Sequence, residues 1–237
     1  QQSAFLPGRL ITDNTLIAFE TFHHPKQNKN KKKCFVGIKL DMAKAYDRIE
    51  WPFLEATLNT MGFPNRLVQT IMRCVSSVTF SILVNGKASQ QFTPNRGIRQ
   101  GDPLSPNLFI LCADVLSRMI TQKQDNSFIN GINIANNAPK IFHLFFADDN
   151  ILFCRAHKEE AIHLMDVFTE YQRISGQKIN LDKSEMTFSP NIHHFIQQEF
   201  QAAMPIRVTE NINKYLGMST QIGRSKHQVF KFIMDRV

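Results

Sequence analysis

The chain has 237 residues, and 28 Lys and Arg against 20 Asp and Glu give it a formal net charge of +8. Its 43% hydrophobic and 20% charged residues are typical of a globular protein, which excludes a disordered chain. Charges interrupt the apolar runs within about ten residues, too short a span to cross a bilayer, so we expect no membrane partner. The positive charge suits an anionic partner such as nucleic acid but does not identify one.

The N-terminus and the cysteines indicate an intracellular protein. The first residues lack the basic segment and apolar core of a secretory signal, and the absence of an initial Met suggests a fragment. The cysteines are widely spaced and form no CxxC pattern, so we expect reduced thiols rather than disulfides or a zinc site: Cys34, Cys74, Cys112 and Cys154.

The N-terminal part of the chain predicts a helix, a loop and a strand. The helix covers Asn14–Phe22 and is followed by a lysine-rich segment, Lys26–Lys33. Like charges in this segment repel one another, so we expect a solvated loop. The apolar run Cys34–Leu40 then predicts a buried strand.

Two helices and a hairpin follow this strand. Apolar residues at steps of three and four predict a helix over Trp51–Met61, and a second helix covers Asn65–Val75. The dipeptide Asn85-Gly86 is the turn signal of a β-hairpin that spans Val78–Pro94. A loop rich in Gly and Pro, Asn95–Pro106, comes next.

The second half of the chain alternates between strands and helices. A helix over Leu108–Ile120 precedes two strand-like runs that flank Ala147-Asp148-Asp149. The remaining elements are expected to be helices over 158–174, 192–203 and 226–237 and short strands over 186–188 and 215–216. Because hairpins require antiparallel pairing and helices lie between them, the predicted fold class is α+β.

Two adjacent carboxylates, Asp148 and Asp149, lie between apolar triplets in the run LFFADDNILF. A turn alone can account for Asp, because its side chain bonds the local backbone. Buried strands on both sides nevertheless concentrate negative charge where its desolvation is costly. Hard divalent cations relieve that cost, and Mg²⁺ takes carboxylate and phosphate oxygens as ligands.

A third carboxylate, Asp41, ends the buried strand in the run KLDMAKAYDRIEW. Asp47 would lie near the start of the following helix, where a carboxylate favours the helix dipole, and is interpreted as structural. Asp41 from a strand end and Asp148 and Asp149 from a hairpin are the minimum for a two-metal site. In such a site each ion binds one oxygen of an in-line phosphoryl displacement.

The segment RGIRQGDPLSPNLF, residues 96–109, is the third notable feature. Its paired glycines allow close approach of another backbone, and its prolines stiffen the entry to the next helix. On its own it could be an ordinary loop with Ser105 as the N-cap.

Taken in order, these three segments resemble the signature blocks of reverse transcriptases, and more narrowly those of LINE-type non-LTR retrotransposons of plants. The resemblance covers essentially the whole chain, because three further blocks match. These are a fingers block at 2–14, a block at 176–184 and a primer-grip region at 214–217. Six ordered blocks are far more specific than any one of them.

The resemblance implies an RNA-directed DNA polymerase. Asp41, Asp148 and Asp149 would be the catalytic residues that hold two Mg²⁺ ions, while a primer 3′-hydroxyl attacks the α-phosphate of a dNTP. The implied partners are an RNA template, a DNA primer and dNTPs, with salt-dependent binding through phosphate contacts. Nothing in the sequence indicates an oligomeric state.

Five further residues receive roles from the resemblance. Tyr46 falls on the aromatic position that excludes a ribose 2′-hydroxyl, and Gln100 and Gly101 would line the pocket of the nascent base pair. Arg9 would contact the template or the triphosphate, and Lys183 would donate a proton to pyrophosphate. Plainer alternatives are a core aromatic for Tyr46 and solvated surface cations for Arg9 and Lys183.

The implied architecture is a polymerase palm, an antiparallel sheet backed by helices, with partial fingers and the start of a thumb. We assign 1–33 and 65–106 to the fingers, 34–64 and 107–222 to the palm and 223–237 to the thumb. Action in the nucleus is also implied by the family.

Two other functions remain open. A catalytically inert retroelement remnant would fold around the palm but polymerise nothing. A maturase-like protein would bind RNA with the help of an attached helical domain. The three carboxylates argue against the maturase-like protein and leave the inert remnant open, and measured primer extension would separate the polymerase from both alternatives.

Overall fold

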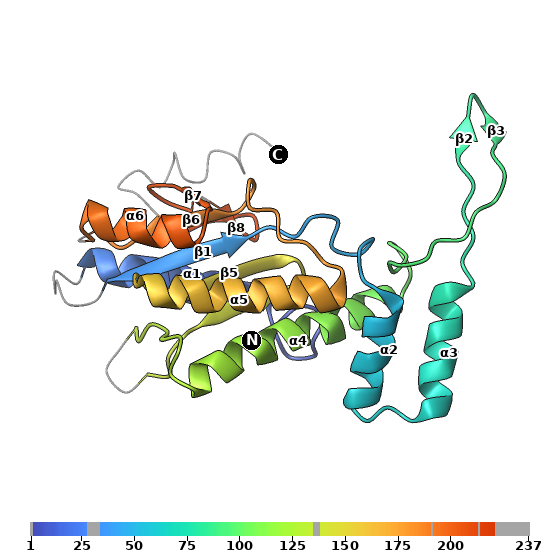
Figure 1. Cartoon of the computed structure of the whole chain (residues 1–237), viewed down its shortest axis with the longest axis horizontal. Coiled ribbons are helices and arrows are strands. Elements are labelled where there is room, and N and C mark those ends of the chain that lie inside the picture. Colours follow the sequence, from blue (N-terminus) through green and yellow to red (C-terminus); the bar gives the residue numbers. More distant parts are fainter. Residues whose placement is uncertain (1, 28–33, 135–137, 191, 213, 221–237) are drawn as a thin grey trace.

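A five-stranded sheet forms the centre of the molecule in the computed structural model, which describes residues 2–27, 34–134, 138–190, 192–212 and 214–220 (Figure 1). From edge to edge the strands are β4 (His143–Phe146), β5 (Asp149–Arg155), β1 (Phe35–Leu40), β6 (Glu185–Phe188) and β7 (Arg207–Val208). The first apolar run of the sequence therefore forms the middle strand, β1, with a partner on each side.

Strand β1 pairs antiparallel with both of its neighbours, and β4 forms a tight antiparallel hairpin with β5. The predicted α+β class and antiparallel palm centre are confirmed. The edge strand β7 differs, because the sequence does not predict it and it pairs with β6 in parallel. Parallel neighbours need a crossover connection, and helix α6 (His194–Ala203) lies between these two strands in the chain.

Five helices of the described chain pack around the larger of two apolar cores, which also receives the inward side chains of β1. These helices are α2 (Trp51–Thr60), α3 (Asn65–Ser76), α4 (Ser105–Asp125), α5 (Lys158–Ser175) and α6. Val36, Ile38 and Leu40 alternate along β1 and all enter this core, as expected for a strand with one face turned to it. Helix α3 lies beside α2 (Figure 1).

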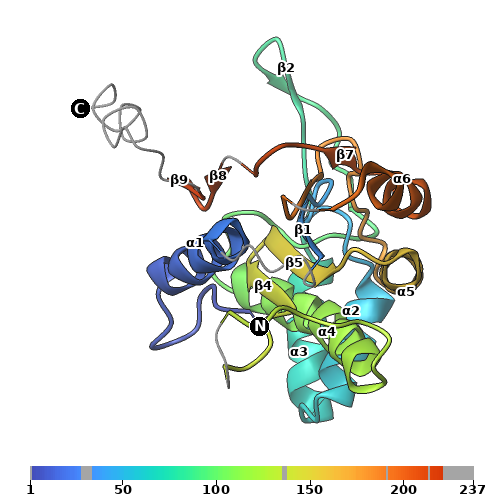
Figure 2. The same ribbon diagram turned by 90° about the vertical axis from the view of Figure 1, so that its left-hand side faces the viewer.

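Helix α1 (Ile11–Gln27) lies against the opposite face of the sheet (Figure 2). Phe22 of α1 packs there with Phe35 of β1 and Phe153 of β5 in a smaller core. Gly37 of β1 permits this close approach, because a Cβ at that position would lie 2.4 Å from Cε1 of Phe22. The sheet is thus covered on both faces.

The predicted hairpin forms a ribbon that projects from the rest of the molecule (Figure 1). Its regular strands, β2 (Leu83–Val84) and β3 (Lys87–Ala88), are shorter than the predicted span, although an isolated bridge joins Phe80 to Phe92. Asn85 and Gly86 occupy the turn with positive φ, as the sequence predicts. A two-stranded ribbon exposed on both faces has little to support longer regular pairing.

Most remaining elements form where the sequence predicts them, with longer ends. Helix α1 continues to Gln27, into the lysine-rich segment that we expected to be a loop, while residues 28–33 lie outside the described residues. The strand expected at 215–216 is part of a small hairpin, β8 (Lys214–Tyr215) and β9 (Met218–Ser219). The helix expected at 226–237 and the thumb assignment also lie outside the described residues.

None of the helices in the described part of the chain is both long and apolar enough to span a lipid bilayer.

The contact between α1 and β1 generates a stability prediction. Gly37→Ala should lower the free energy of unfolding by about 1–3 kcal/mol, because the new methyl group would overlap the Phe22 ring. Chemical denaturation measures the loss. In the double variant with Phe22→Leu, which lacks the overlapping ring atoms, part of the stability should return. Strictly additive losses in the double variant would contradict the proposed contact.

Candidate active site

The turn between β4 and β5 carries two of the three predicted carboxylates. Phe146 pairs with Asp149, so Ala147 and Asp148 form the turn itself. Ala147 has a φ of 53°, a left-handed conformation that costs a residue with a Cβ about 1–2 kcal/mol. The Nδ2 group of Asn150 donates a hydrogen bond to the backbone oxygen of Asp148 over 3.2 Å and so closes the turn. As a result Asp148 is exposed at the tip and Asp149 is half-buried.

Sheet register brings the third carboxylate to the same edge. Leu40, the last residue of β1, pairs with Asn150 of β5. Asp41, which directly follows the end of β1, therefore lies beside Asp149, which begins β5. Residues 41 and 149 are far apart in the chain, and only the antiparallel pairing of β1 with β5 makes them neighbours.

The segment that precedes β6 forms hydrogen bonds with Asp41 and with the turn that follows it. The backbone N–H of Asp41 donates to Oγ of Ser184 over 3.1 Å. Nε2 of the buried Gln177 donates to the backbone oxygen of Ala45 over 2.9 Å. These bonds fix the backbone on both sides of the turn that follows β1.

Burial raises the pKa of the Asp149 carboxyl above its ordinary value, and the negative charges of Asp148 and Asp41 raise it further, while Lys39 opposes the shift. Asp148 and Asp41 are therefore both within electrostatic reach of Asp149. Bringing three like charges to one edge of a sheet is unfavourable unless a cation compensates them.

Their oxygens are the hard donors that a divalent cation prefers, so the chemistry of the three side chains fits a metal ion. Within the described ranges, no three Asp, Glu, His or Cys side chains are gathered closely enough to hold a metal ion. The carboxylates are neighbours at the sheet edge rather than an assembled set of ligands.

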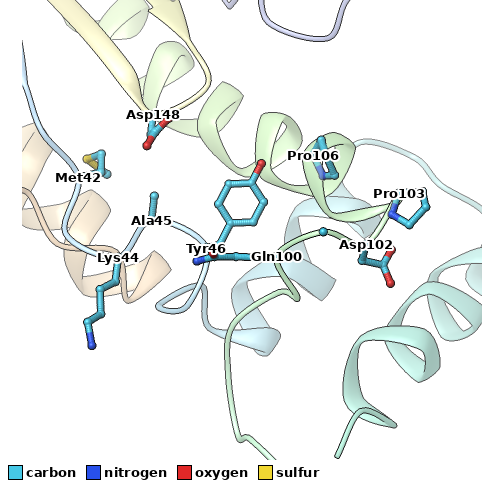
Figure 3. A pocket seen from close by; sticks show the side chains of 10 residues that line it. Met42, Lys44, Ala45, Tyr46, Gln100, Asp102, Pro103, Pro106 and Asp148 are labelled. Carbon is cyan, nitrogen blue, oxygen red and sulfur yellow. The ribbon is translucent and has the colours of Figure 1, made fainter. Parts of the chain in front are cut away.

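A cavity of about 660 Å³ opens beside Asp148 (Figure 3). Its walls come from the β4–β5 turn, the turn after β1, and the segment that leads into α4. The lining residues are Met42, Lys44, Ala45, Tyr46, Gln100, Gly101, Asp102, Pro103, Pro106 and Asp148. The cavity thus joins four of the residues singled out in the sequence, namely Tyr46, Gln100, Gly101 and Asp148.

Tyr46 extends into the middle of this cavity (Figure 3). Its ring stacks on Phe109 of α4, with the ring centroids 4.8 Å apart and the planes 5° from parallel. Burial, and to a smaller extent the charge of Asp148, raise the pKa of the Tyr46 hydroxyl. Tyr46 is therefore an uncharged aromatic wall whose ring is held by packing.

The glycine-rich loop docks on the turn after β1. Nε2 of Gln100 donates to Oδ1 of Asp47 over 3.2 Å. At Gly97, with a φ of 87°, an added Cβ would lie 2.7 Å from the Asp47 backbone oxygen, which confirms the predicted close approach. An added Cβ at Gly101 would have no atom within 4 Å, so glycine is favoured there by its left-handed φ of 83° alone. Asp47 lies before the first turn of α2, so its carboxylate is hydrogen-bonded to Gln100 and is not placed to interact with the helix dipole.

Four predicted site residues do not line the cavity. Asp41 and Asp149 are neighbours at the edge of the sheet, next to the turn that carries Asp148. Arg9 is exposed in the turn before α1, and Lys183 is exposed in the turn before β6. Lys183 is next to Ser184, which bonds the backbone of Asp41, so its segment adjoins the carboxylates. The roles assigned to Arg9 and Lys183 stay predictions.

Sequence reasoning missed several residues of the cavity wall. Lys44 lines the cavity from a turn position with a φ of 51°, and its place between Asp41 and Tyr46 was the available signal. Asp102 also lines the cavity, and its Oδ1 accepts the backbone N–H of Leu104 over 2.8 Å. Ser105 is the first residue of α4 and Leu104 is the N-cap, so the alternative of an ordinary loop capped by Ser105 does not hold.

The family of the chain follows from its similarity to known proteins. Residues 1–220 match the reverse transcriptase (RNA-dependent DNA polymerase) family, and the chain belongs to that family. A Pol polyprotein from the type-2 retrotransposable element R2DM of Drosophila melanogaster is 31% identical over 183 residues, 77% of this chain and 16% of that protein. The transposon TX1 149 kDa protein of Xenopus laevis is 25% identical over 92% of this chain.

The expected resemblance to non-LTR retrotransposon enzymes is thereby confirmed. An uncharacterized mitochondrial protein of Arabidopsis thaliana is 52% identical over 67 residues, 28% of this chain and 55% of that protein, which fits the expected plant character. The chain spans 16% of the length of both the R2DM and the TX1 proteins.

Solved structures show the same fold. Apo telomerase from Candida tropicalis, truncated from its C-terminal domain, superposes with a TM-score of 0.56 at 18% identity over 76% of this chain and 36% of that chain. A Candida albicans telomerase, solved in complex with a fragment of telomeric RNA, gives a TM-score of 0.56 at 13% identity, over 81% of this chain and 32% of that chain.

The raised pKa of Asp149 predicts a pH-dependent stability. The folded chain binds this proton more tightly than the unfolded chain, so stability falls as the pH rises through the folded-state pKa. Asp149→Asn should therefore melt at a higher temperature than the parent chain at pH 7. The difference should vanish below the ordinary aspartate pKa of 3.8, where both states are protonated.

Thermal unfolding followed by circular dichroism at the two pH values measures this effect. Asp182→Asn, at an exposed position, is the matched control. If Asp149→Asn instead melts below the parent chain at pH 7, the electrostatic account of the three carboxylates is wrong.

Proposed function

We propose that this chain is the palm-centred part of an RNA-directed DNA polymerase that acts within a LINE-type retroelement. The observation that supports it most strongly is the pairing of β1 with β5, which makes Asp41 a neighbour of the Asp148-Asp149 turn. Family membership supports the same reaction. RNA template, DNA primer and dNTPs are the proposed partners.

Asp41, Asp148 and Asp149 would hold two Mg²⁺ ions, because their clustered negative charge needs hard divalent counter-ions. Such ions would neutralise charge that develops on the phosphoryl oxygens as the primer 3′-hydroxyl attacks. The fold would orient these carboxylates, since the β4–β5 turn and the end of β1 fix the backbone positions from which the side chains extend.

The cavity beside Asp148 is the proposed site for the incoming dNTP. Tyr46 would pack against the sugar and leave no room for a 2′-hydroxyl, because its ring is held by Phe109. Gln100, held by Asp47, and Gly101 would border the nascent base pair. Lys44 adds positive charge to the cavity wall, which favours a triphosphate.

Lys183 is proposed as the proton donor to pyrophosphate and Arg9 as a contact to template or triphosphate. Both side chains are exposed and lie outside the cavity lining, so they would contact parts of the substrate that extend beyond the cavity. Action in the nucleus is proposed from the family alone.

Primer extension tests the proposed reaction. The chain should incorporate dNTPs on a primed RNA template in a Mg²⁺-dependent manner, and Asp148→Asn should reduce the rate at least about 100-fold. Asp125→Asn, at the exposed end of α4, should retain the rate of the parent chain.

Equal incorporation by the parent chain and Asp148→Asn would overturn the site. A parent chain that binds primed RNA without extending it would favour the maturase-like alternative. A parent chain that does neither would favour the inert remnant.

A second prediction concerns the choice of sugar. Tyr46→Ala should increase incorporation of ribonucleotides relative to deoxyribonucleotides by at least about tenfold, because the aromatic wall is removed. Tyr46→Phe, which keeps the ring and its stacking on Phe109, should discriminate as the parent chain does. Competition between rNTP and dNTP in single-nucleotide extension measures the ratio. Unchanged discrimination in Tyr46→Ala would make Tyr46 a core aromatic only.

A further inference from the structure

Gln2 bonds directly to the turn that carries Asp148, although it lies 145 residues away in the chain. Its side chain is 9% exposed, and its backbone forms a parallel bridge with Phe145 of β4. Oε1 of Gln2 accepts the backbone N–H of Ala147 over 3.2 Å. The residue before Asp148 is therefore held by a side chain from the N-terminal segment.

The same oxygen accepts two more backbone N–H groups, those of Ser3 and Ala4, each over 3.0 Å. Three donors converging on one atom require the amide oxygen there, which fixes the orientation of the side chain. The Nε2 group of Gln2 is buried and has no hydrogen-bond partner within the described chain. Oε1 is thus the atom of this side chain that forms hydrogen bonds. Its bond to Ala147 joins the N-terminal segment to the β4–β5 turn.

The turn needs such support for a physical reason. Ala147 has a φ of 53°, which an Ala adopts at a cost, and the turn tip is exposed to solvent. Asn150 closes the turn from the β5 side by bonding the Asp148 carbonyl. Gln2 accepts the backbone N–H of Ala147, the residue before Asp148, and so supports the turn from the N-terminal segment.

The anchor of Gln2 is itself well held. The backbone N–H of Ser3 is shared between Oε1 of Gln2 and the Phe145 oxygen, each over 3.0 Å. Nδ2 of the buried Asn14 in α1 donates to the Phe145 oxygen over 3.0 Å, and Oδ1 of Asn14 accepts the hydroxyl of Ser3 over 2.8 Å. The N-terminal segment is therefore attached to β4 independently of the bond to Ala147.

We propose that Gln2 is a positioning residue for nucleotide transfer, whose amide oxygen sets the conformation of the Ala147-Asp148 turn and hence the place of the Asp148 and Asp149 carboxylates. The proposal rests on the proposed function for its catalytic part. It predicts that loss of the acceptor lowers the rate of the chemical step, while the dNTP cavity, which Gln2 does not line, keeps its affinity.

Steady-state primer extension separates these effects. Gln2→Met keeps the length of the side chain and removes the acceptor, and it should lower kcat about 10–100-fold with the KM for dNTP within about twofold. Gln2→Glu keeps an oxygen at the same reach, so the Ala147 amide hydrogen should exchange as slowly as in the parent chain, although the added negative charge beside Asp148 and Asp149 lowers kcat.

Ser117→Ala is the matched control, because it removes a buried hydrogen bond to His143 of the same strand, β4, and leaves the N-terminal segment intact. Its kcat should stay within about threefold of the parent value, whereas a purely structural role of Gln2 predicts equal losses in both variants. Equal losses of kcat in both variants, or fast exchange of the Ala147 amide hydrogen in Gln2→Glu, would overturn the proposal.

Amide hydrogen exchange gives a readout that needs no activity. The Ala147 amide should exchange at least about tenfold faster in Gln2→Met than in the parent chain, relative to the Ile38 amide in β1. Should Gln2→Met fail to fold, Gln2→Asn keeps an amide too short to reach Ala147 and should show the same change. Fast exchange of Ala147 in the parent chain would overturn the bond. A parent chain without polymerase activity would refute the proposed function alone, because the exchange rates still decide whether Gln2 holds the turn.

Discussion

The antiparallel pairing of β1 with β5 is the constraint on which the rest of the site depends. Its register makes Asp41 and Asp149 neighbours, and Asp148 follows from the turn that joins β4 to β5. Burial and the negative charges of Asp148 and Asp41 raise the pKa of Asp149, while Lys39 opposes the shift. A divalent cation held there, as in phosphoryl transfer by metal ions, would lower the electrostatic cost of this arrangement.

Each carboxylate-bearing turn is braced by a different part of the chain. The turn after β1 is held by the segment before β6, through Gln177 and Ser184. The β4–β5 turn is held by Gln2, from the N-terminal segment that α1 anchors to the sheet. The glycine-rich loop adds the third wall of the cavity by docking on the first of these turns. Segments that are distant in the sequence therefore act as supports for two short turns.

Much of this arrangement could be predicted from the sequence, because it depends on local signals. The apolar run of β1 and the Asn85-Gly86 turn are local patterns, and both formed as predicted. The three carboxylates were identified by their unusual apolar surroundings. The parallel edge strand β7 and the support from Gln2 could not be predicted, because they depend on which distant segments meet. Lys44 was passed over although it lies between Asp41 and Tyr46, because an exposed lysine in such a place is most often only solvated until the cavity around it is known.

The most direct measurement of the central claim is the number of Mn²⁺ ions bound by the chain, used as a spectroscopic substitute for Mg²⁺, with primed RNA and a non-hydrolysable dNTP analogue present. Electron paramagnetic resonance counts the bound ions. The account predicts two ions per parent chain and fewer in Asp41→Asn and in Asp148→Asn, because the strand end and the turn would share the same ions. An equal number of bound ions in the parent chain and in both variants would contradict the account, since the carboxylates brought together by β1 and β5 would then hold no metal.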